Sequence, residues 1–166
     1  MECVMSRMRM KLLIIGHGRH GKVSVAEIIQ KAKQLTFTSS SMTAANLFIF
    51  DAMKDMYNSP EECYNDRINH RATWFKLITD FNKNDPSMLA KKILLDNDIY
   101  VGMRSRREFE HSKSLFDHVI WVDASKRLPY EYSTMELEER DADIIIDNNG
   151  TLDDFKKNVS GAIDRL

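Results

Sequence analysis

The 166-residue sequence predicts an α/β protein in three layers, with helices on both faces of a central parallel sheet of about five strands. Short apolar runs alternate along the chain with stretches whose apolar residues recur every three or four positions. The runs have the length of buried strands, and the stretches have the spacing of amphipathic helices. Such alternation favours parallel strands, because each connection must cross back over one face of the sheet.

The first half of the chain predicts two strands and four helices. Residues 10–15 (MKLLII) form a short apolar run that ends at a glycine-rich turn, as a buried parallel strand does. Ser59 and Pro60 suit the N-cap and the first position of a helix, and Glu62 supplies an acid two positions later. Spacing and capping together predict helices at 22–35, 42–56, 59–81 and from 85 onwards, with a short strand at 36–38.

The second half of the chain predicts three further strands and the end of the domain. The strands cover residues 98–102, 118–122 and 143–146, and helices cover 105–115 and 151–165. Residues 124–141 show no clear period, and loops of that length in compact domains are often functional lids. We expect one domain over residues 10–166, with a candidate lid at 124–141 and a flexible N-terminal extension at 1–9.

Composition narrows the range of partners. The formal net charge of −1 argues against strong nonspecific binding to nucleic acid, which depends on neutralising phosphates. The two cysteines, Cys3 and Cys63, imply neither a disulfide framework nor a zinc site, so a cytoplasmic setting is expected. No apolar run approaches the roughly 20 residues that cross a bilayer, so no membrane partner is expected. The oligomeric state does not follow from the sequence.

The most specific motif follows the first predicted strand and opens a predicted helix. Residues 16–24 read GHGRHGKVS and complete the pattern G-x-x-x-x-G-K. Glycines let backbone N–H groups turn toward a phosphate chain, and the helix N-terminus adds partial positive charge there. Lys22 can reach the β- and γ-phosphates. The predicted nucleotide-binding residues are Gly16, His17, Gly18, Arg19, His20, Gly21, Lys22, Val23 and Ser24.

One position of this loop departs from the usual pattern. Val23 stands where Ser or Thr normally supplies a hydroxyl to Mg²⁺, and the hydroxyl comes one residue later at Ser24. We expect Ser24 to contact the metal or a phosphate, with Mg²⁺ held directly or through water. His17 and His20 lack a third zinc ligand at useful spacing, so we expect them to flank the phosphate or face solvent.

Residues 10–166 resemble the P-loop nucleoside and nucleotide kinases, and look most similar to the small deoxynucleoside monophosphate kinase-like proteins of bacteriophages. The segments that carry the resemblance are GHGRHGKVSVAEI, YVGMRSRREFE, VIWVDAS and DADIIIDNNGTLDDF. In this group the loop lysine is often followed by Asp-Thr, so Ser24 matches the threonine while Val23 replaces the aspartate. The resemblance implies a P-loop kinase fold, an ATP and Mg²⁺ requirement, and a location in the host cytoplasm if the protein is phage-encoded.

The resemblance leaves three functions open. The first is phosphorylation of a deoxynucleoside monophosphate or related deoxynucleotide, which predicts a closed acceptor pocket. A related phage group is thought to phosphorylate 5-hydroxymethyluracil within DNA, which predicts a wide cleft with a basic rim and DNA as a partner. The third is a nucleotide-binding module without turnover, suggested by Val23 and by Gly102, which ends the predicted strand 98–102 where an acid might have been expected.

The segment after residues 98–102 supplies an arginine cluster. Arg104 stands nearest the carboxyl end of that predicted strand, where ligands bind in open parallel sheets. An arginine there can grip an acceptor phosphate or stabilise the transferring group. The alternative is a solvated helix start, in which Arg106 and Arg107 also take part.

Two further clusters are candidates for binding the acceptor. Arg67, His70 and Arg71 fall near one edge of the predicted helix 59–81, and the alternative is an ordinary solvated face. Ser39, Ser40 and Ser41 follow the second predicted strand, where Ser39 and Ser40 are the candidates for binding the acceptor, and the alternative is a helix N-cap with spare serines.

The acid near the metal is poorly specified by the sequence. Asp51 and Asp123 compete for this role, and Asp123 ends the predicted strand 118–122 in a Walker-B-like setting. Arg127 and Arg140 lie in the candidate lid and could close on a triphosphate. The residues predicted to take part in catalysis are Lys22, Arg104, Asp123 and Arg127.

Overall fold

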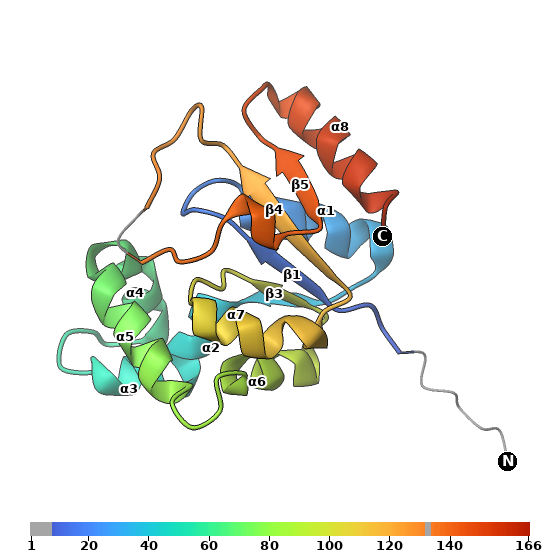
Figure 1. Ribbon diagram of the computed structural model, residues 1–166. Helices are drawn as coiled ribbons and strands as arrows, with labels where there is room; N and C mark the ends of the chain where they lie inside the picture. Colours follow the sequence, from blue (N-terminus) through green and yellow to red (C-terminus); the bar gives the residue numbers. More distant parts are fainter. Residues whose placement is uncertain (1–7, 132–133) are drawn as a thin grey trace, which may run out of the picture.

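The computed structural model describes residues 8–131 and 134–166, which form a sheet between two layers of helices (Figure 1). Within these residues the sheet has five parallel strands in the order β2-β3-β1-β4-β5. They are β1 (Leu12–Ile15), β2 (Phe37–Ser39), β3 (Ile99–Val101), β4 (His118–Asp123) and β5 (Ile144–Asp147). The predicted three-layer α/β class is confirmed.

Strand β1 lies at the centre of the sheet, where the strand order reverses. Leu13 is opposite Tyr100 of β3 on one side and opposite Val119 of β4 on the other. The chain places β2 and β3 on the first side and β4 and β5 on the second. Open parallel sheets bind ligands outside the carboxyl ends of their strands at such a reversal. The loop that follows Ile15 occupies this place.

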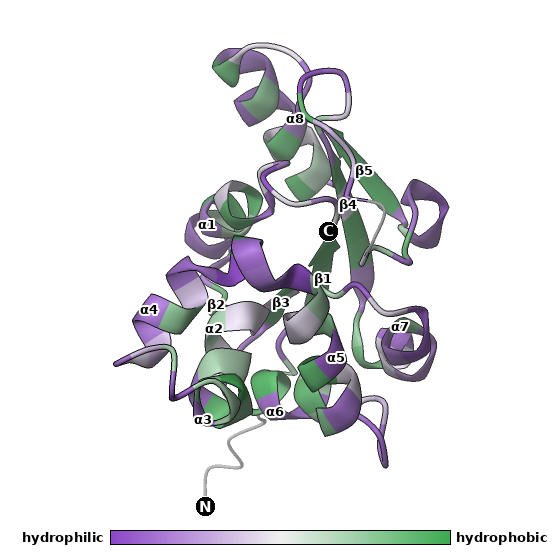
Figure 2. Ribbon diagram, turned by 90° about the vertical axis from the view of Figure 1, so that its left-hand side faces the viewer, coloured by the Kyte–Doolittle hydropathy of each residue, from purple (hydrophilic) through white to green (hydrophobic). Residues whose placement is uncertain are grey.

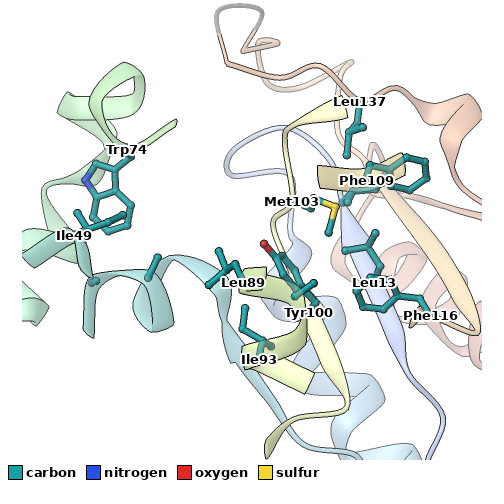
Figure 3. Close-up of a cluster of buried hydrophobic side chains, with 14 of the residues drawn as sticks. Leu13, Ile49, Trp74, Leu89, Ile93, Tyr100, Met103, Phe109, Phe116 and Leu137 are labelled. Atoms are coloured by element: carbon teal, nitrogen blue, oxygen red, sulfur yellow. The ribbon is translucent and has the colours of Figure 1, made fainter. Parts of the chain in front are cut away.

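The two faces of the sheet bury two separate cores, because alternate residues of a strand point to opposite sides. Leu12 and Ile14 pack in the core beneath α1 (Lys22–Lys33) and α8 (Leu152–Ile163). Leu13 and Ile15 belong to the other core, part of which Figure 3 shows around Tyr100. Figure 2 shows hydrophobic strands between helices that carry both hydrophilic and hydrophobic residues.

The second core is covered by a series of shorter helices. They are α2 (Ser40–Ala44), the π-helix η1 (Ala45–Ile49), α3 (Phe50–Ala52), α4 (Pro60–Asn65), α5 (Arg71–Phe81), α6 (Met88–Asp96) and α7 (Arg106–Ser112). The short 3₁₀ turns are η2 (Arg67–His70), η3 (Lys113–Leu115) and η4 (Glu139–Asp141). The helix predicted at 42–56 therefore begins two residues earlier, contains a π-turn and ends sooner.

The prediction of a continuous helix over residues 59–81 is wrong, because η2 separates α4 from α5. Asp66 ends α4, and its carboxylate accepts hydrogen bonds from the Tyr57 hydroxyl at 2.6 Å and from Asn69 Nδ2 at 2.6 Å. Side chains of Asp and Asn that bond locally compete with the regular helical pattern. The break turns the chain just before Arg71, which begins α5.

Parts of two predicted segments lie outside the described residues. Residues 1–7 of the predicted N-terminal extension, with Cys3, lie outside the described residues, as do residues 132–133 of the candidate lid. The described parts of residues 124–141 have no regular structure before η4. None of the described helices has the length and apolar character needed to span a membrane.

Candidate phosphate-binding site

The loop between β1 and α1 adopts a tightly constrained backbone. Gly16 and Gly21 have φ angles of 142° and 104°, which side chains rarely tolerate, and Arg19 is left-handed with φ at 65°. A Cβ atom at Gly16 would lie 2.6 Å from the carbonyl oxygen of Val122. Gly21 caps α1 without a side-chain hydrogen bond. The first N–H groups of α1 therefore face the loop without a capping side chain, as an anion-binding helix end requires.

Lys22 lies at the floor of the loop. Its Nζ donates hydrogen bonds to the carbonyl oxygens of Gly16 at 2.7 Å and His17 at 2.6 Å. Burial, together with the nearby charge of Arg104, lowers the pKa of Lys22 to about 7. An anion placed beside this ammonium would oppose that shift and favour the charged form.

His17 and His20 brace the back of the loop instead of facing solvent, and both side chains are buried. Nδ1 of His17 accepts a hydrogen bond from the backbone N–H of Glu131 at 3.0 Å, and Nδ1 of His20 accepts one from Ala124 at 3.0 Å. An accepting nitrogen carries no proton, so each ring is neutral in this arrangement. Burial, the largest cause, lowers the pKa of His17 to about 4 and also lowers that of His20. The solvent-facing alternative for these histidines is wrong.

A cavity of about 500 Å³ opens in front of the loop. The loop contributes the wall that runs from Gly18 to Ser24, including Lys22 and the side chain of Val23. The opposite wall comes from the ends of β2 and β3 and from the helices around η2. It carries the predicted acceptor residues Ser39, Arg67, Arg71 and Arg104, together with Ser41 and Tyr64.

The cavity is strongly basic. Arg67 stacks over the Tyr64 ring, with its guanidinium carbon 3.8 Å from the ring centroid. Arg71 and Arg104 both line the cavity, and within the described residues the buried Nε of Arg71 has no hydrogen-bond partner. A buried donor without a partner is costly unless a ligand or water satisfies it. The arrangement is suited to a polyanionic ligand.

Glu131 is the acid that enters this basic site. Its carboxylate accepts a hydrogen bond from the backbone N–H of Gly18 at 2.8 Å. It also pairs with Arg104 Nη2 at 2.8 Å and with Arg71 Nη2 at 3.2 Å. Glu131 could not be identified from the sequence, because nothing in the aperiodic segment 124–141 distinguishes it from the other acids there.

A smaller cavity adjoins the first one, between α5 and β3. Arg71 and Arg104 line both cavities, while Trp74, Tyr100 and Glu108 line the smaller one. The Tyr100 hydroxyl donates to Oε1 of Glu108 at 2.5 Å, and burial raises the pKa of Glu108 to about 7. Sequence reasoning missed this pair, since its two members fall on a strand and a helix with no shared motif.

Several predicted site residues lie elsewhere. The carboxylate of Asp123 accepts from Asn149 Nδ2 at 3.0 Å, and Arg127 Nε donates to the Asn148 carbonyl at 2.8 Å. Both are outside the described lining of the two cavities, next to the turn before α8. Asp51 is exposed on α3, and Arg140 pairs with Glu138 at 2.7 Å.

The remaining predicted acceptor residues have local partners. His70 Nε2 lies 3.2 Å from the carboxylate of Asp66 and is outside the described lining of both cavities. Ser39 caps α2 by accepting from the Met42 N–H, so the predicted capping role is confirmed. The Ser40 hydroxyl donates to the Val101 carbonyl at 2.5 Å and lines the smaller cavity.

The fold is similar to that of solved kinases. A gluconokinase from Sinorhizobium meliloti 1021 is 13% identical, with a TM-score of 0.54 over 95% of this chain and 93% of that chain. A shikimate kinase from Bacteroides thetaiotaomicron is 8% identical, with a TM-score of 0.55 over 95% of this chain and 98% of that chain. Neither a scan against protein-family models nor a search of curated proteins found a match. At such identities the likeness establishes the fold alone.

Proposed function

We propose that this protein is an ATP-dependent phosphotransferase whose acceptor is a deoxynucleoside monophosphate. The observation that carries the proposal is one continuous basic cavity. It joins the phosphate loop, with Lys22, to Arg67, Arg71 and Arg104 on the opposite wall. A donor triphosphate on the loop and a phosphate-bearing acceptor on the arginines would then meet in the same space, as in-line transfer requires.

On the donor side, the loop N–H groups would hold the β- and γ-phosphates and Lys22 would neutralise the transferring group. To do so, Nζ of Lys22 would leave the two loop carbonyls that it contacts. Ser24 lines the cavity and is the loop hydroxyl that suits Mg²⁺, so it fits the metal that ATP brings. When bound, Mg²⁺ supplies charge neutralisation and alignment of the phosphates.

On the acceptor side, the three arginines favour a phosphorylated acceptor over a neutral one. Guanidinium groups bind phosphate through paired N–H donors, and the free Nε of Arg71 adds another donor. The smaller cavity, walled by Trp74, Phe75 and Tyr100, has a volume of about 40 Å³, too small for a nucleobase, so the less polar part of the acceptor would lie in the main cavity of about 500 Å³. Because the loop and the residues around η2 wall the main cavity on two sides, we infer that a free nucleotide suits it better than duplex DNA.

The experiment that tests the proposal is a screen of transfer from γ-labelled ATP. The acceptors are the deoxynucleoside monophosphates, nucleosides, gluconate, shikimate, and DNA with and without 5-hydroxymethyluracil. We expect label on at least one monophosphate, and none when Lys22→Ala replaces the wild type. Label found on DNA or on a sugar acid alone would reject the proposed acceptor class. ATP binding without acceptor-dependent transfer would favour a nucleotide-binding module.

A further inference from the structure

The carboxylate of Glu131 lies within the loop that we assign to phosphate. Oε2 accepts hydrogen bonds from the Gly18 N–H and from Arg104 Nη2, both at 2.8 Å, while Oε1 pairs with Arg71 Nη2 at 3.2 Å. A Cβ atom built on Gly18 would come within 2.4 Å of Oε1. The carboxylate therefore rests against the loop backbone with no space between them.

These donors are the ones that an anionic phosphoryl group would use. A backbone N–H of the loop and two guanidinium groups converge on one negative group from three sides. Although burial alone would raise it, the adjacent Arg104 charge and these hydrogen bonds lower the pKa of Glu131 to about 2. The carboxylate is thus a full negative charge at any pH near neutrality.

The backbone of Glu131 is fixed by the same loop. Its N–H donates to Nδ1 of His17 at 3.0 Å, and His17 is itself buried beneath the loop. Figure 1 shows that the segment after β4 leaves the sheet and turns back toward α4. Hydrogen bonds hold both the backbone N–H and the carboxylate of Glu131, so its contact with the loop does not depend on the rotamer of a freely exposed side chain.

We propose that Glu131 is an internal ligand of the phosphate loop, which occupies the place of a phosphoryl group and leaves when a polyphosphate binds. This inference rests on one part of the proposed function, namely that the loop of residues 16–24 binds phosphate. The loop cannot hold two anions at once, so binding must displace the carboxylate from the Gly18 N–H, which also frees Arg71 and Arg104 for the acceptor. The apparent affinity is then the intrinsic affinity reduced by the fraction of molecules in which the loop is free.

The test is calorimetric binding of inorganic tripolyphosphate, which needs neither acceptor nor turnover. The variants are Glu131→Gln and Glu131→Ala, each checked for folding by circular dichroism. The matched control is Glu136→Gln, which removes the same charge from an exposed position in the same segment. We expect the two Glu131 variants to bind roughly tenfold more tightly than the wild type, as follows if about one loop in ten is free. The control should bind like the wild type.

Each other outcome overturns the inference. Equal tightening in Glu136→Gln would show that net charge alone is responsible. Unchanged or weaker binding in both folded Glu131 variants would show that this carboxylate does not compete with the ligand. If tripolyphosphate binds to none of the proteins, the phosphate assignment of the loop fails, and the proposed function fails with it. Normal binding in the wild type with no gain in the variants would overturn the inference alone.

Discussion

At the scale of single residues, the structure accommodates Val23 at the loop position where Ser or Thr is usual. Val23 is 42% exposed and borders the main cavity, so its side chain is not needed for core packing. Threonine has nearly the same shape as valine and carries a hydroxyl. Sequence reasoning identified this departure, but the exposure of the side chain follows from the structure.

The first prediction follows from that exposure. Val23→Thr should keep or raise Mg²⁺-dependent transfer and lower the Mg²⁺ concentration needed for half-maximal rate, because it restores the usual metal-binding hydroxyl. The measurement is a Mg²⁺ titration of initial rates. Val23→Ala is the control, since it shortens the side chain without adding a hydroxyl. If threonine abolishes ATP binding, the explanation of the departure is wrong.

A second residue-scale prediction concerns the pH dependence of stability. Burial raises the pKa of Glu108 from 4.5 to about 7 in the folded protein, so the folded state binds a proton more tightly than the unfolded chain. The contribution of Glu108 to the free energy of unfolding is therefore fully present below pH ~4.5 and falls as the pH rises to ~7, by roughly 3 kcal/mol.

The measurement is urea unfolding of the wild type and of Glu108→Gln between pH 4.5 and 8. The stability difference between the two should shift in favour of Glu108→Gln as the pH rises. Comparing the two proteins cancels the opposite slope expected from His17 and His20, whose pKa values are lowered. Glu110→Gln on the exposed side of α7 is the control. A pH-independent difference between wild type and Glu108→Gln would contradict the prediction.

At the scale of elements, the carboxyl ends of the strands determine which side chains reach the cavity. Arg104 lines it because β3 ends three residues earlier, at Val101, on the edge of the sheet that also carries the glycine-rich loop after β1. Arg107 lies in the first turn of α7 and its Nη2 donates to the Lys83 carbonyl at 3.4 Å, away from the cavity. Two arginines three residues apart thus have different surroundings.

This difference gives the third prediction. Arg104→Ala should raise the acceptor KM or lower kcat by roughly tenfold or more, because a charged hydrogen bond to phosphate is lost, and should change ATP affinity less. Arg104→Lys should rescue only partly, since an ammonium cannot donate in a bidentate manner. Acceptor and ATP are titrated separately, with Arg107→Ala as the control. Equal weakening toward both substrates would contradict the assignment of Arg104 to the acceptor.

The sequence predicts the elements well where the pattern is strong and local. The glycine-rich loop, the five strands and the capped start of α4 at Ser59 all follow from residue types at short spacing. The break at η2 could not be predicted, because it depends on Asp66 collecting hydrogen bonds from Tyr57 and Asn69. The ends of helices depend on such side-chain contacts more than on the spacing of apolar residues in the sequence.

At the scale of the whole molecule, the site is assembled from segments far apart in the chain. The sequence predicts a parallel sheet but not the order of its strands. The reversal of the strand order at β1 brings Lys22, Arg71 and Arg104 to one cavity. Glu131 enters the same site from a segment with no period, so no pattern could place it. Arg104 follows a strand end and lines the cavity, whereas Asp123, at the same edge of the sheet, accepts a hydrogen bond from Asn149.

The central claim, that the cavity is built for phosphoryl transfer, is tested most directly by acceptor-dependent ADP formation in the wild type and in Lys22→Ala. Losing a preorganised charge of this kind costs on the order of 10²–10³ in rate. We predict that a deoxynucleoside monophosphate stimulates ADP formation by the wild type, and that folded Lys22→Ala loses nearly all of this stimulated rate. A folded Lys22→Ala protein with wild-type rates, or a wild type whose ADP formation no acceptor stimulates, would contradict the claim.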